Sequence, residues 1–215
     1  SLWYNANKIM EALSKKFGNS LNAKKYKKIA QECKSSFESK FYNAKRKCLY
    51  DVIGDGKIRP NQLFALSLSH PIVDNAKIAE QVLNTVENKL LNRYGLQTLS
   101  SDEEGYVDVY EGSAYKRDSS YHQGITWPWL LGLYYDALKN TMIIEKNRTK
   151  RQELEEKITK LVDTTKETFK AEMFERSSIG TISEIYDSTE PYEERGAFAQ
   201  AWSVAEIFRI VLNKR

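Results

Sequence analysis

The chain of 215 residues is 41% hydrophobic and 29% charged, which is enough apolar material for a packed domain and excludes an intrinsically disordered chain. Its 33 basic and 29 acidic residues give a net charge of +4, and the spread of the basic residues along the chain argues against a nucleic-acid partner. No apolar run approaches the roughly 20 residues that span a bilayer, so no membrane partner is expected.

Apolar residues recur every three to four positions along most of the chain, a spacing that predicts an all-α protein of about seven helices. The clearest stripes cover residues 2–17, 26–41, 78–90, 154–169 and 202–212. Gly18 ends the first helix, and Thr149 with Gln152 has the spacing of a helix-capping box. No strand pattern of useful length is present.

Three long loops interrupt the helices, at residues 43–60, 96–126 and 173–194. Loops longer than about 12–15 residues are uncommon in compact domains unless they are functional or disordered, and the aromatic and polar residues here favour function. Each loop leads to a helix start that carries a glutamine: Gln62, Gln123 and Gln200. This weak repeat predicts stacked helical hairpins, an α/α toroid, whose loop junctions converge on one face.

The side chains expected on this face suit a sugar, because aromatic rings cover the apolar face of a pyranose while amides, arginine and carboxylates bind its hydroxyls. The segment Trp127-Pro128-Trp129 is the most suggestive. Trp127 precedes a proline at a helix start, a poor place for core packing and a fair place to line a pocket. For Trp129 and Trp202, a role in the core and a role in lining the pocket are equally supported.

Glu184 is the carboxylate best placed for chemistry, because it stands between two apolar residues in a loop that also holds Tyr186 and Asp187. Partial desolvation there would create a base. The alternative, which spacing alone slightly favours, is a structural cap that pairs with Arg195. Asp118 is equally interpreted as a helix cap or an ion-pair partner.

The residue pattern predicts no metal site. No second histidine or carboxylate stands at metal-ligand spacing from His122. Three interpretations of His122 stay open: a ligand, a base, or a pocket residue that forms hydrogen bonds. Cys33 and Cys48 form neither a disulfide framework nor a zinc site, and they are interpreted as small buried hydrophobes. With no signal peptide visible at Ser1-Leu2-Trp3-Tyr4, a cytoplasmic location is expected.

Eight segments occur in the order found in one known family: Leu2–Ala6, Ile58–Gln62, Leu90–Ser100, Tyr110–Ser113, Tyr121–Gly124, Trp127–Trp129, Ile182–Asp187 and Gln200–Glu206. Together they resemble the C-terminal part of the amylo-α-1,6-glucosidase domain of glycogen debranching enzymes. Each segment alone is weakly specific, whereas the ordered set runs the length of the chain. The resemblance implies an α/α toroid of six helical hairpins, with glycogen or α-glucan oligosaccharide as the partner. It also implies hydrolysis of α-1,6-linked glucose at branch stubs, without a cofactor.

The resemblance places the general base of an inverting glycosidase on Glu184. Such enzymes protonate the leaving oxygen with an acid and activate water with a base on the opposite face of the sugar. Glucose-contacting roles fall on Arg59, Asn61, Gln62, Tyr121, His122, Gln123, Trp127, Trp129, Tyr186 and Trp202. Because Glu184 must be ionised, a nearby tyrosine hydroxyl or Arg195 is expected to keep its carboxylate charged.

The resemblance also implies that residues 1–215 form a single partial domain. Six hairpins require about twelve helices, more than the chain predicts. The general-acid aspartate of the family also lies before the segment in which the chain begins. We therefore expect roughly the C-terminal half of a toroid, inactive alone. A half-toroid would expose the apolar surface that the other helices normally cover. We therefore expect a homodimer that forms through the first helix and the long lysine-rich helix.

Two other functions stay open. A trehalase- or glucoamylase-like α/α-toroid glycosidase would share the aromatic pocket but cleave a different linkage. A non-catalytic helical carbohydrate-binding domain would bind α-glucan and would be indifferent to the substitution Glu184→Gln.

Overall fold

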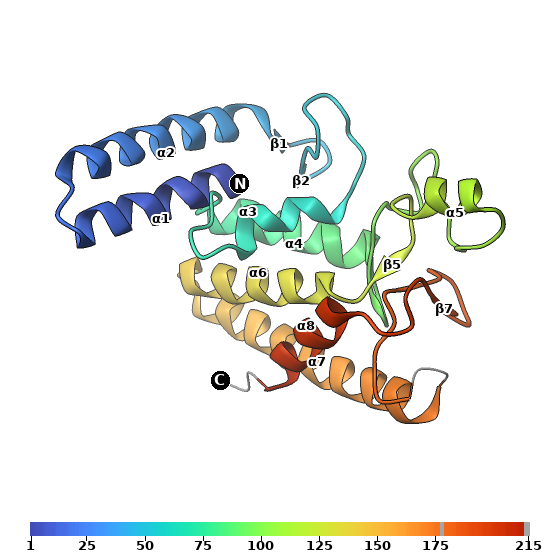
Figure 1. Ribbon diagram of the computed structural model, residues 1–215. Coiled ribbons are helices and arrows are strands. Elements are labelled where there is room, and N and C mark those ends of the chain that lie inside the picture. Colours follow the sequence, from blue (N-terminus) through green and yellow to red (C-terminus); the bar gives the residue numbers. More distant parts are fainter. Residues whose placement is uncertain (177–178, 213–215) are drawn as a thin grey trace.

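Helices make up most of the computed structural model, which describes residues 1–176 and 179–212 (Figure 1). The described helices are α1 (Leu2–Lys16), α2 (Ser20–Lys40), α3 (Phe64–Ser67), α4 (Ala76–Lys89), α5 (Ala114–Ser120), α6 (Leu130–Ile144), α7 (Arg148–Glu175) and α8 (Ala201–Leu212). A 3₁₀ turn, η1 (Pro60–Leu63), precedes α3. The predicted helical character is confirmed, with eight α-helices in the described ranges where about seven were expected.

Asparagines start three of the long helices. The side chains of Asn19, Asn75 and Asn147 accept hydrogen bonds of 3.0, 3.2 and 3.1 Å from main-chain N–H groups in the first turns of α2, α4 and α7. The capping box predicted at Thr149 and Gln152 is therefore wrong. Asn147 caps this helix two residues earlier, because a short amide side chain satisfies an N–H that has no partner within the helix.

A five-stranded antiparallel sheet, which the sequence pattern does not predict, joins two of the long loops. Its strands, in spatial order, are β3 (Leu91–Asn92), β4 (Gly95–Gln97), β5 (Thr126–Trp127), β6 (Ile185–Tyr186) and β7 (Glu194–Arg195). A separate hairpin pairs β1 (Tyr42–Asn43) with β2 (Cys48–Leu49). Strands this short contain no alternation that a pattern can detect. Their pairing nevertheless fixes where the loops meet.

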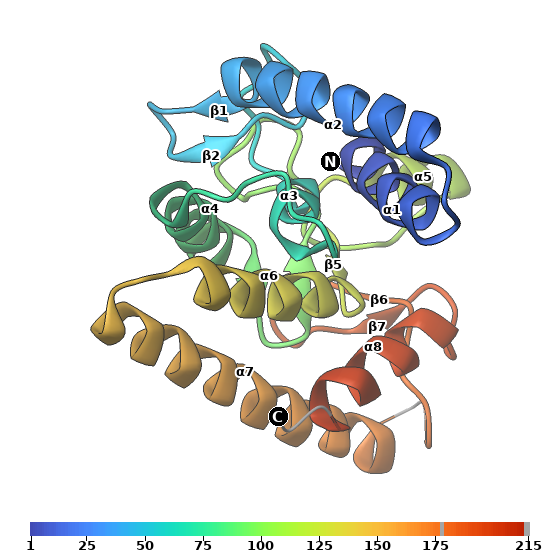
Figure 2. The same ribbon diagram turned by 90° about the vertical axis from the view of Figure 1, so that its left-hand side faces the viewer.

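The central helix α6 packs against α3 and α4 on one side and against α7 and α8 on the other (Figure 2). One core cluster fills the space among α3, α4 and α6, and a second lies among α6, α7 and α8. β5 leads directly into α6, so the sheet sits at the start of this buried helix. Within the described ranges, no helix combines the length and the apolar character needed to cross a membrane.

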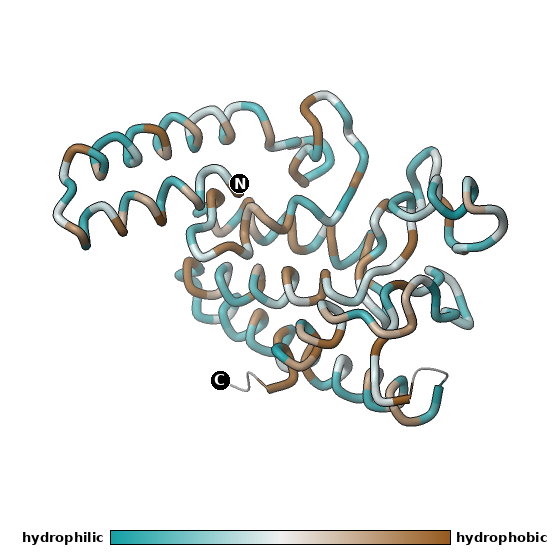
Figure 3. Tube along the Cα trace, in the orientation of Figure 1, coloured by the Kyte–Doolittle hydropathy of each residue, from teal (hydrophilic) through white to brown (hydrophobic). Residues whose placement is uncertain are grey.

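The α1–α2 hairpin extends from this body, and the apolar stripe of α1 faces solvent (Figures 1 and 3). Leu2, Trp3 and Phe17 are 61%, 64% and 78% exposed. The buried residues of α1 are instead polar, and among them Glu11 pairs with lysines on either side of it. The predicted helical period is thus confirmed, while the stripe lies outside the core.

Gly124 lets two loop segments pass each other closely. Its φ is +138°, and a Cβ there would lie 2.2 Å from the Val107 carbonyl oxygen, which is main chain and cannot rotate away. Gly105 is a matched control, because its φ is +88° but its Cβ would meet nothing within 4 Å. We expect Gly124→Ala to lower the free energy of unfolding by about 2 kcal/mol more than Gly105→Ala. Equal losses in denaturant titrations of the two variants would contradict this packing.

Candidate functional site

Arg59 joins two of the long loops. Its Nη1 donates to the carbonyl oxygens of Thr98 (3.1 Å) and His122 (2.8 Å), and its Nη2 donates to Gln123 Oε1 (2.9 Å). Gln62 is 5% exposed, donates to the Arg59 carbonyl (2.9 Å) and accepts from a main-chain N–H of β2. The predicted convergence of these junctions is therefore present. Arg59, Gln62 and Gln123 hold the loops in place through these bonds.

A small cavity of about 200 Å³ opens beside Arg59. It is lined by Arg59, Pro60, Asn61, Thr98, His122, Trp127, Trp129, Leu130 and Trp202. Two stacked ring pairs form its aromatic wall, His122 with Trp127 at 5.3 Å and Trp129 with Trp202 at 5.3 Å. Trp127 and Trp202 meet edge to face, at an interplanar angle of 71°. Such a wall offers flat apolar faces next to a few polar groups, a composition that suits a sugar ring.

The tryptophans of this wall differ in burial. Trp127 is only 3% exposed, pairs with Leu96 across β4 and β5, and donates from Nε1 to the Tyr121 carbonyl (3.2 Å). Trp127 lines the cavity, as its position before Pro128 favours, but the expectation that this position disfavours core packing is wrong, because the strand pairing also draws it into the core. Trp202 is 46% exposed and forms the open part of the wall.

Glu184, immediately before β6, has a carboxylate held by three donors. The Tyr121 hydroxyl and Gln200 Nε2 (3.2 Å) donate to Oε1, and the Ala197 main-chain N–H donates to Oε2 (3.0 Å). An ionised carboxylate offers about four lone-pair positions, so one position on Oε2 is not used by these three donors. A carboxylate anchored in this way can still accept a proton, as a general base must.

Arg195 does not pair with Glu184. Its Nε and Nη2 bind Asp187 Oδ2 at 3.0 and 2.8 Å, and Asp187 Oδ1 accepts from the Tyr110 main-chain N–H (2.8 Å). The alternative interpretation of Glu184 as a structural partner of Arg195 is therefore wrong. The Asp187–Arg195 pair instead ties β6 to β7 and fixes the segment after β7 beside Glu184.

The close approach of the main chain after β7 to Glu184 requires a glycine at position 196. Its φ is +69°, and a Cβ would lie 2.4 Å from Glu184 Oε2. The sequence predictions did not include Gly196 or Ala197 in the site, because both contribute main chain and have no side-chain signature. Gln200 appeared only through the weak repeat of glutamines at helix starts.

The electrostatics keep two ring side chains of the site neutral. Burial, and then the hydrogen bond to the Glu184 carboxylate, raise the pKa of Tyr121 above its ordinary value, so its hydroxyl stays a donor. Desolvation, and then the charge of Arg59, lower the pKa of His122 against the opposing effect of Glu184. A neutral imidazole both donates and accepts hydrogen bonds, which is useful toward a hydroxyl.

Among the predicted site residues, Glu184, Gln62, Tyr121 and Gln123 do not line the cavity, and Tyr186 points away from it altogether. Tyr186 is fully buried, its ring stacks on Tyr94 at 4.6 Å, and its hydroxyl donates to Glu172 Oε1 (2.9 Å). Alternation along β6 explains this, because its neighbours Ile185 and Asp187 take the other direction. Tyr186 therefore belongs to the core and not to the wall of the cavity.

The remaining candidate residues are Asn61 and the two cysteines. Asn61 is exposed at the rim of the cavity and donates to Asp51 Oδ1 (3.0 Å). Cys48 is buried and Cys33 half-buried, and both are free thiols. In residues 1–176 and 179–212, no three His, Cys, Asp or Glu side chains are grouped closely enough to hold a metal ion.

Comparison with known proteins identifies the family of the chain and a structure of similar fold. A family described as amylo-alpha-1,6-glucosidase matches residues 1–209, nearly the whole chain. A solved structure described as a sialidase is similar, with a TM-score of 0.67 and 15% sequence identity. The match covers 96% of this chain and 19% of that one, so this chain spans about a fifth of the length of that relative. At this identity the likeness concerns the fold alone.

Proposed function

The chain belongs to the amylo-alpha-1,6-glucosidase family, a family of glycosidases, and from this premise we propose that it carries the general base and sugar-binding wall for removing α-1,6-linked glucose from glycogen branch stubs. The observation that carries the proposal is the Glu184 carboxylate, anchored by Tyr121, Gln200 and the Ala197 N–H. The Tyr121 ring in turn contacts His122 and Trp127, which line the aromatic cavity. We place the activity in a longer protein whose α/α toroid this chain completes.

In the proposed reaction, Glu184 removes a proton from a water molecule while the water oxygen bonds to the anomeric carbon. An acid on the opposite face of the sugar protonates the leaving oxygen as its bond to that carbon breaks. The released glucose is inverted at the anomeric centre, and the two carboxyl groups need about 6.5–9.5 Å between them. We assign the acid to a segment outside residues 1–215, and we therefore expect this chain alone to release no glucose.

The cavity supports the sugar part of the proposal. At about 200 Å³ it is smaller than the roughly 300–1,000 Å³ of most ligand pockets, so it suits one hexose unit. Trp202 offers an exposed ring face, and His122 and Asn61 offer polar atoms at the rim. We assign Arg59 a supporting role, because it donates hydrogen bonds to the loop that carries His122.

A substrate panel tests the proposed specificity. A protein that carries the whole domain should release glucose from phosphorylase limit dextrin, and should leave maltose and trehalose intact. Cleavage of maltose or trehalose alone would indicate another toroid glycosidase. Saccharide binding without any cleavage would indicate a binding domain, and both results would overturn the proposal.

Removing the Tyr121 hydroxyl tests how the base is positioned. Hydrogen bonds to charged groups contribute about 1.5–3 kcal/mol, so Tyr121→Phe should lower kcat on limit dextrin by roughly 10- to 100-fold. KM should change little, because the hydroxyl contacts Glu184 and not the proposed sugar cavity. Tyr110→Phe is the control, since its ring lies 5.6 Å from that of Tyr121 while the hydrogen bond to Asp187 comes from its main chain. An unchanged kcat in Tyr121→Phe would contradict this role.

Homodimer formation and a cytoplasmic location belong to the same proposal. The exposed apolar residues toward the end of α1, Leu13 and Phe17, support self-association, because contiguous apolar patches rarely stay uncovered. Light scattering at micromolar concentration should report a dimer of the chain, and a monomer would contradict it. Free Cys33 and Cys48 thiols are consistent with reducing surroundings.

A further inference from the structure

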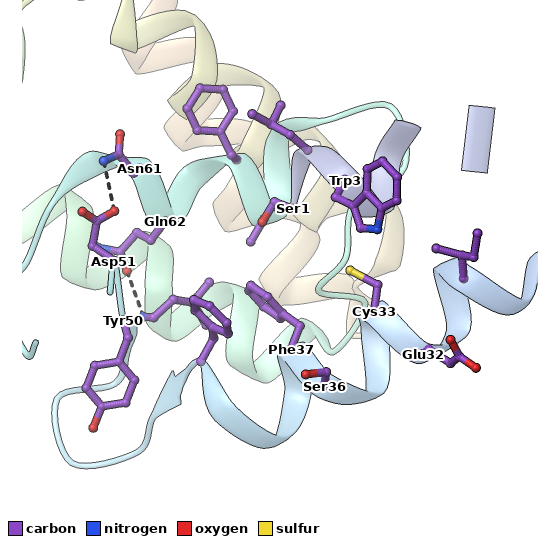
Figure 4. A pocket seen from close by; sticks show the side chains of 16 residues that line it. Ser1, Trp3, Glu32, Cys33, Ser36, Phe37, Tyr50, Asp51, Asn61 and Gln62 are labelled. Atoms are coloured by element: carbon purple, nitrogen blue, oxygen red, sulfur yellow. Dashed lines mark hydrogen bonds between the residues drawn. The ribbon is translucent and has the colours of Figure 1, made fainter. Parts of the chain in front are cut away.

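A second, larger cavity opens on the other side of Asn61. Its volume of about 640 Å³ falls within the roughly 300–1,000 Å³ of ligand pockets. α2 forms one side and η1 with α3 forms the other, while the start of α1 lies toward one end (Figure 4). Asn61 lines both cavities, so the two are neighbours along the surface.

The lining of this cavity combines ring faces with a polar end. Phe37 and Phe41 stack at 4.8 Å with an interplanar angle of 6°, and Trp3 is 64% exposed. Asp51 and Asn61, joined by a 3.0 Å hydrogen bond, lie at the end opposite Trp3 (Figure 4). Rings beside amide and carboxylate groups fit a sugar, whose C–H faces are apolar and whose edges carry hydroxyls.

The charges in this cavity favour a neutral ligand. Its lining includes no lysine or arginine side chain. Its two acidic side chains already have partners, because Asp51 accepts from Asn61 and Glu32 lies 3.9 Å from Lys28. An anion therefore finds little attraction here.

We propose that this larger cavity binds the glucose units of the α-glucan that remain attached across the scissile bond from the unit held in the smaller cavity. This inference rests on the proposed function, because it assumes that the smaller cavity takes the terminal glucose. The polymer must then continue over Asn61, the residue common to both cavities. The consequence is that affinity rises with the length of the glucan.

Cys33 reports directly on occupation of the larger cavity, because its half-buried thiol is part of the lining. Cys48 is an internal control, since it is 1% exposed and burial raises the pKa of its thiol. With the 215-residue chain, a saturating linear α-glucan of seven units should slow Cys33 alkylation about fivefold or more, as mass spectrometry would show, while glucose should not. Glucan binding without protection of Cys33 would overturn this inference and leave the proposed function intact.

Two substitutions test the same cavity by calorimetric titration. Ser36→Trp places a bulky ring in the lining from an exposed position on α2, and Ser35→Trp adds the same ring beside it but outside the lining. Ser36→Trp should remove the gain in affinity that the longer glucan shows over glucose, about tenfold, and Ser35→Trp should keep it.

Asp51→Ala, which adds no bulk, should weaken binding of the longer glucan in the same direction. Equal affinities in all three variants would contradict the second cavity as a glucan site. Absence of any saccharide binding by the unsubstituted chain would instead count against the proposed function itself.

Discussion

Replacing Glu184 with glutamine should lower kcat for glucose release by about 10²- to 10⁴-fold in a protein that carries the whole domain. Glutamine preserves the size of the side chain but cannot accept the proton of the attacking water. Its carbonyl oxygen can still accept from the Ala197 N–H, and its amide can donate to the Tyr121 hydroxyl, while only the 3.2 Å bond from Gln200 is lost. The variant should therefore fold normally and bind saccharide as the unsubstituted protein does.

Glu193→Gln is the matched control for this substitution. Glu193 lies in the segment that joins β6 to β7 and is exposed, so its loss removes the same charge without touching the anchored carboxylate. Its kcat should stay within about twofold of the unsubstituted value. Near-normal glucose release by Glu184→Gln would remove the general base from this site, and Asp51, Asp55 and Asp118 would become the carboxylates to test.

The helices were predictable because each long one repeats its apolar positions over several turns. The sheet was not, since strands such as Ile185–Tyr186 hold only two residues and depend on partners distant in sequence. Helix ends depend on single side chains, and for this reason Asn147 escaped notice while Thr149 was favoured. The stripe on α1 shows a further limit, because a period identifies the apolar face of a helix but not what covers it.

The site was predictable where side chains act and unpredictable where main chain acts. Glu184, Tyr121 and Arg59 stand in aromatic and polar loops, and the structure gathers them through hydrogen bonds. Gly196 and Ala197 were missed because an N–H donor leaves no trace in a sequence pattern. The burial of Tyr186 and of Trp127, which still lines the cavity, was unexpected for a shared reason. Strand pairing, invisible in the sequence, turned both rings into the core.

The hydrogen-bond partner of Tyr186 is a buried glutamate, Glu172, which the proposed reaction does not use. Glu172 on α7 is fully buried, and its Oε1 accepts from the Tyr186 hydroxyl. Its Oε2 lies 3.5 Å from Arg176 Nε, which also binds Glu194 at 2.9 Å. Burial, and then the nearby Glu194 charge, raise the pKa of Glu172 to about 7, although the Tyr186 hydrogen bond and Arg176 oppose the shift.

A raised pKa means that the folded protein binds this proton more tightly than the unfolded chain does. The resulting stabilisation is complete below the unfolded value of 4.5 and is lost as pH rises through about 7. Because each pKa unit corresponds to 1.36 kcal/mol, the loss between pH 4.5 and 8 should be about 3 kcal/mol. Glu172→Gln cannot ionise, and it should therefore abolish this part of the pH dependence.

Denaturant unfolding at pH 4.5 and 8 measures this effect as a difference between variants. Glu172→Gln should lose about 3 kcal/mol less than the unsubstituted protein between the two pH values. The comparison cancels the groups that both proteins share, including His122. Glu175→Gln is the control, because this carboxylate lies on the same helix but is exposed, and it should keep the full loss. If Glu172→Gln and Glu175→Gln lose equal stability as pH rises, folding does not raise the pKa of Glu172. The acidic cluster around Arg176 would then be a permanent ion pair instead of a site that holds a proton.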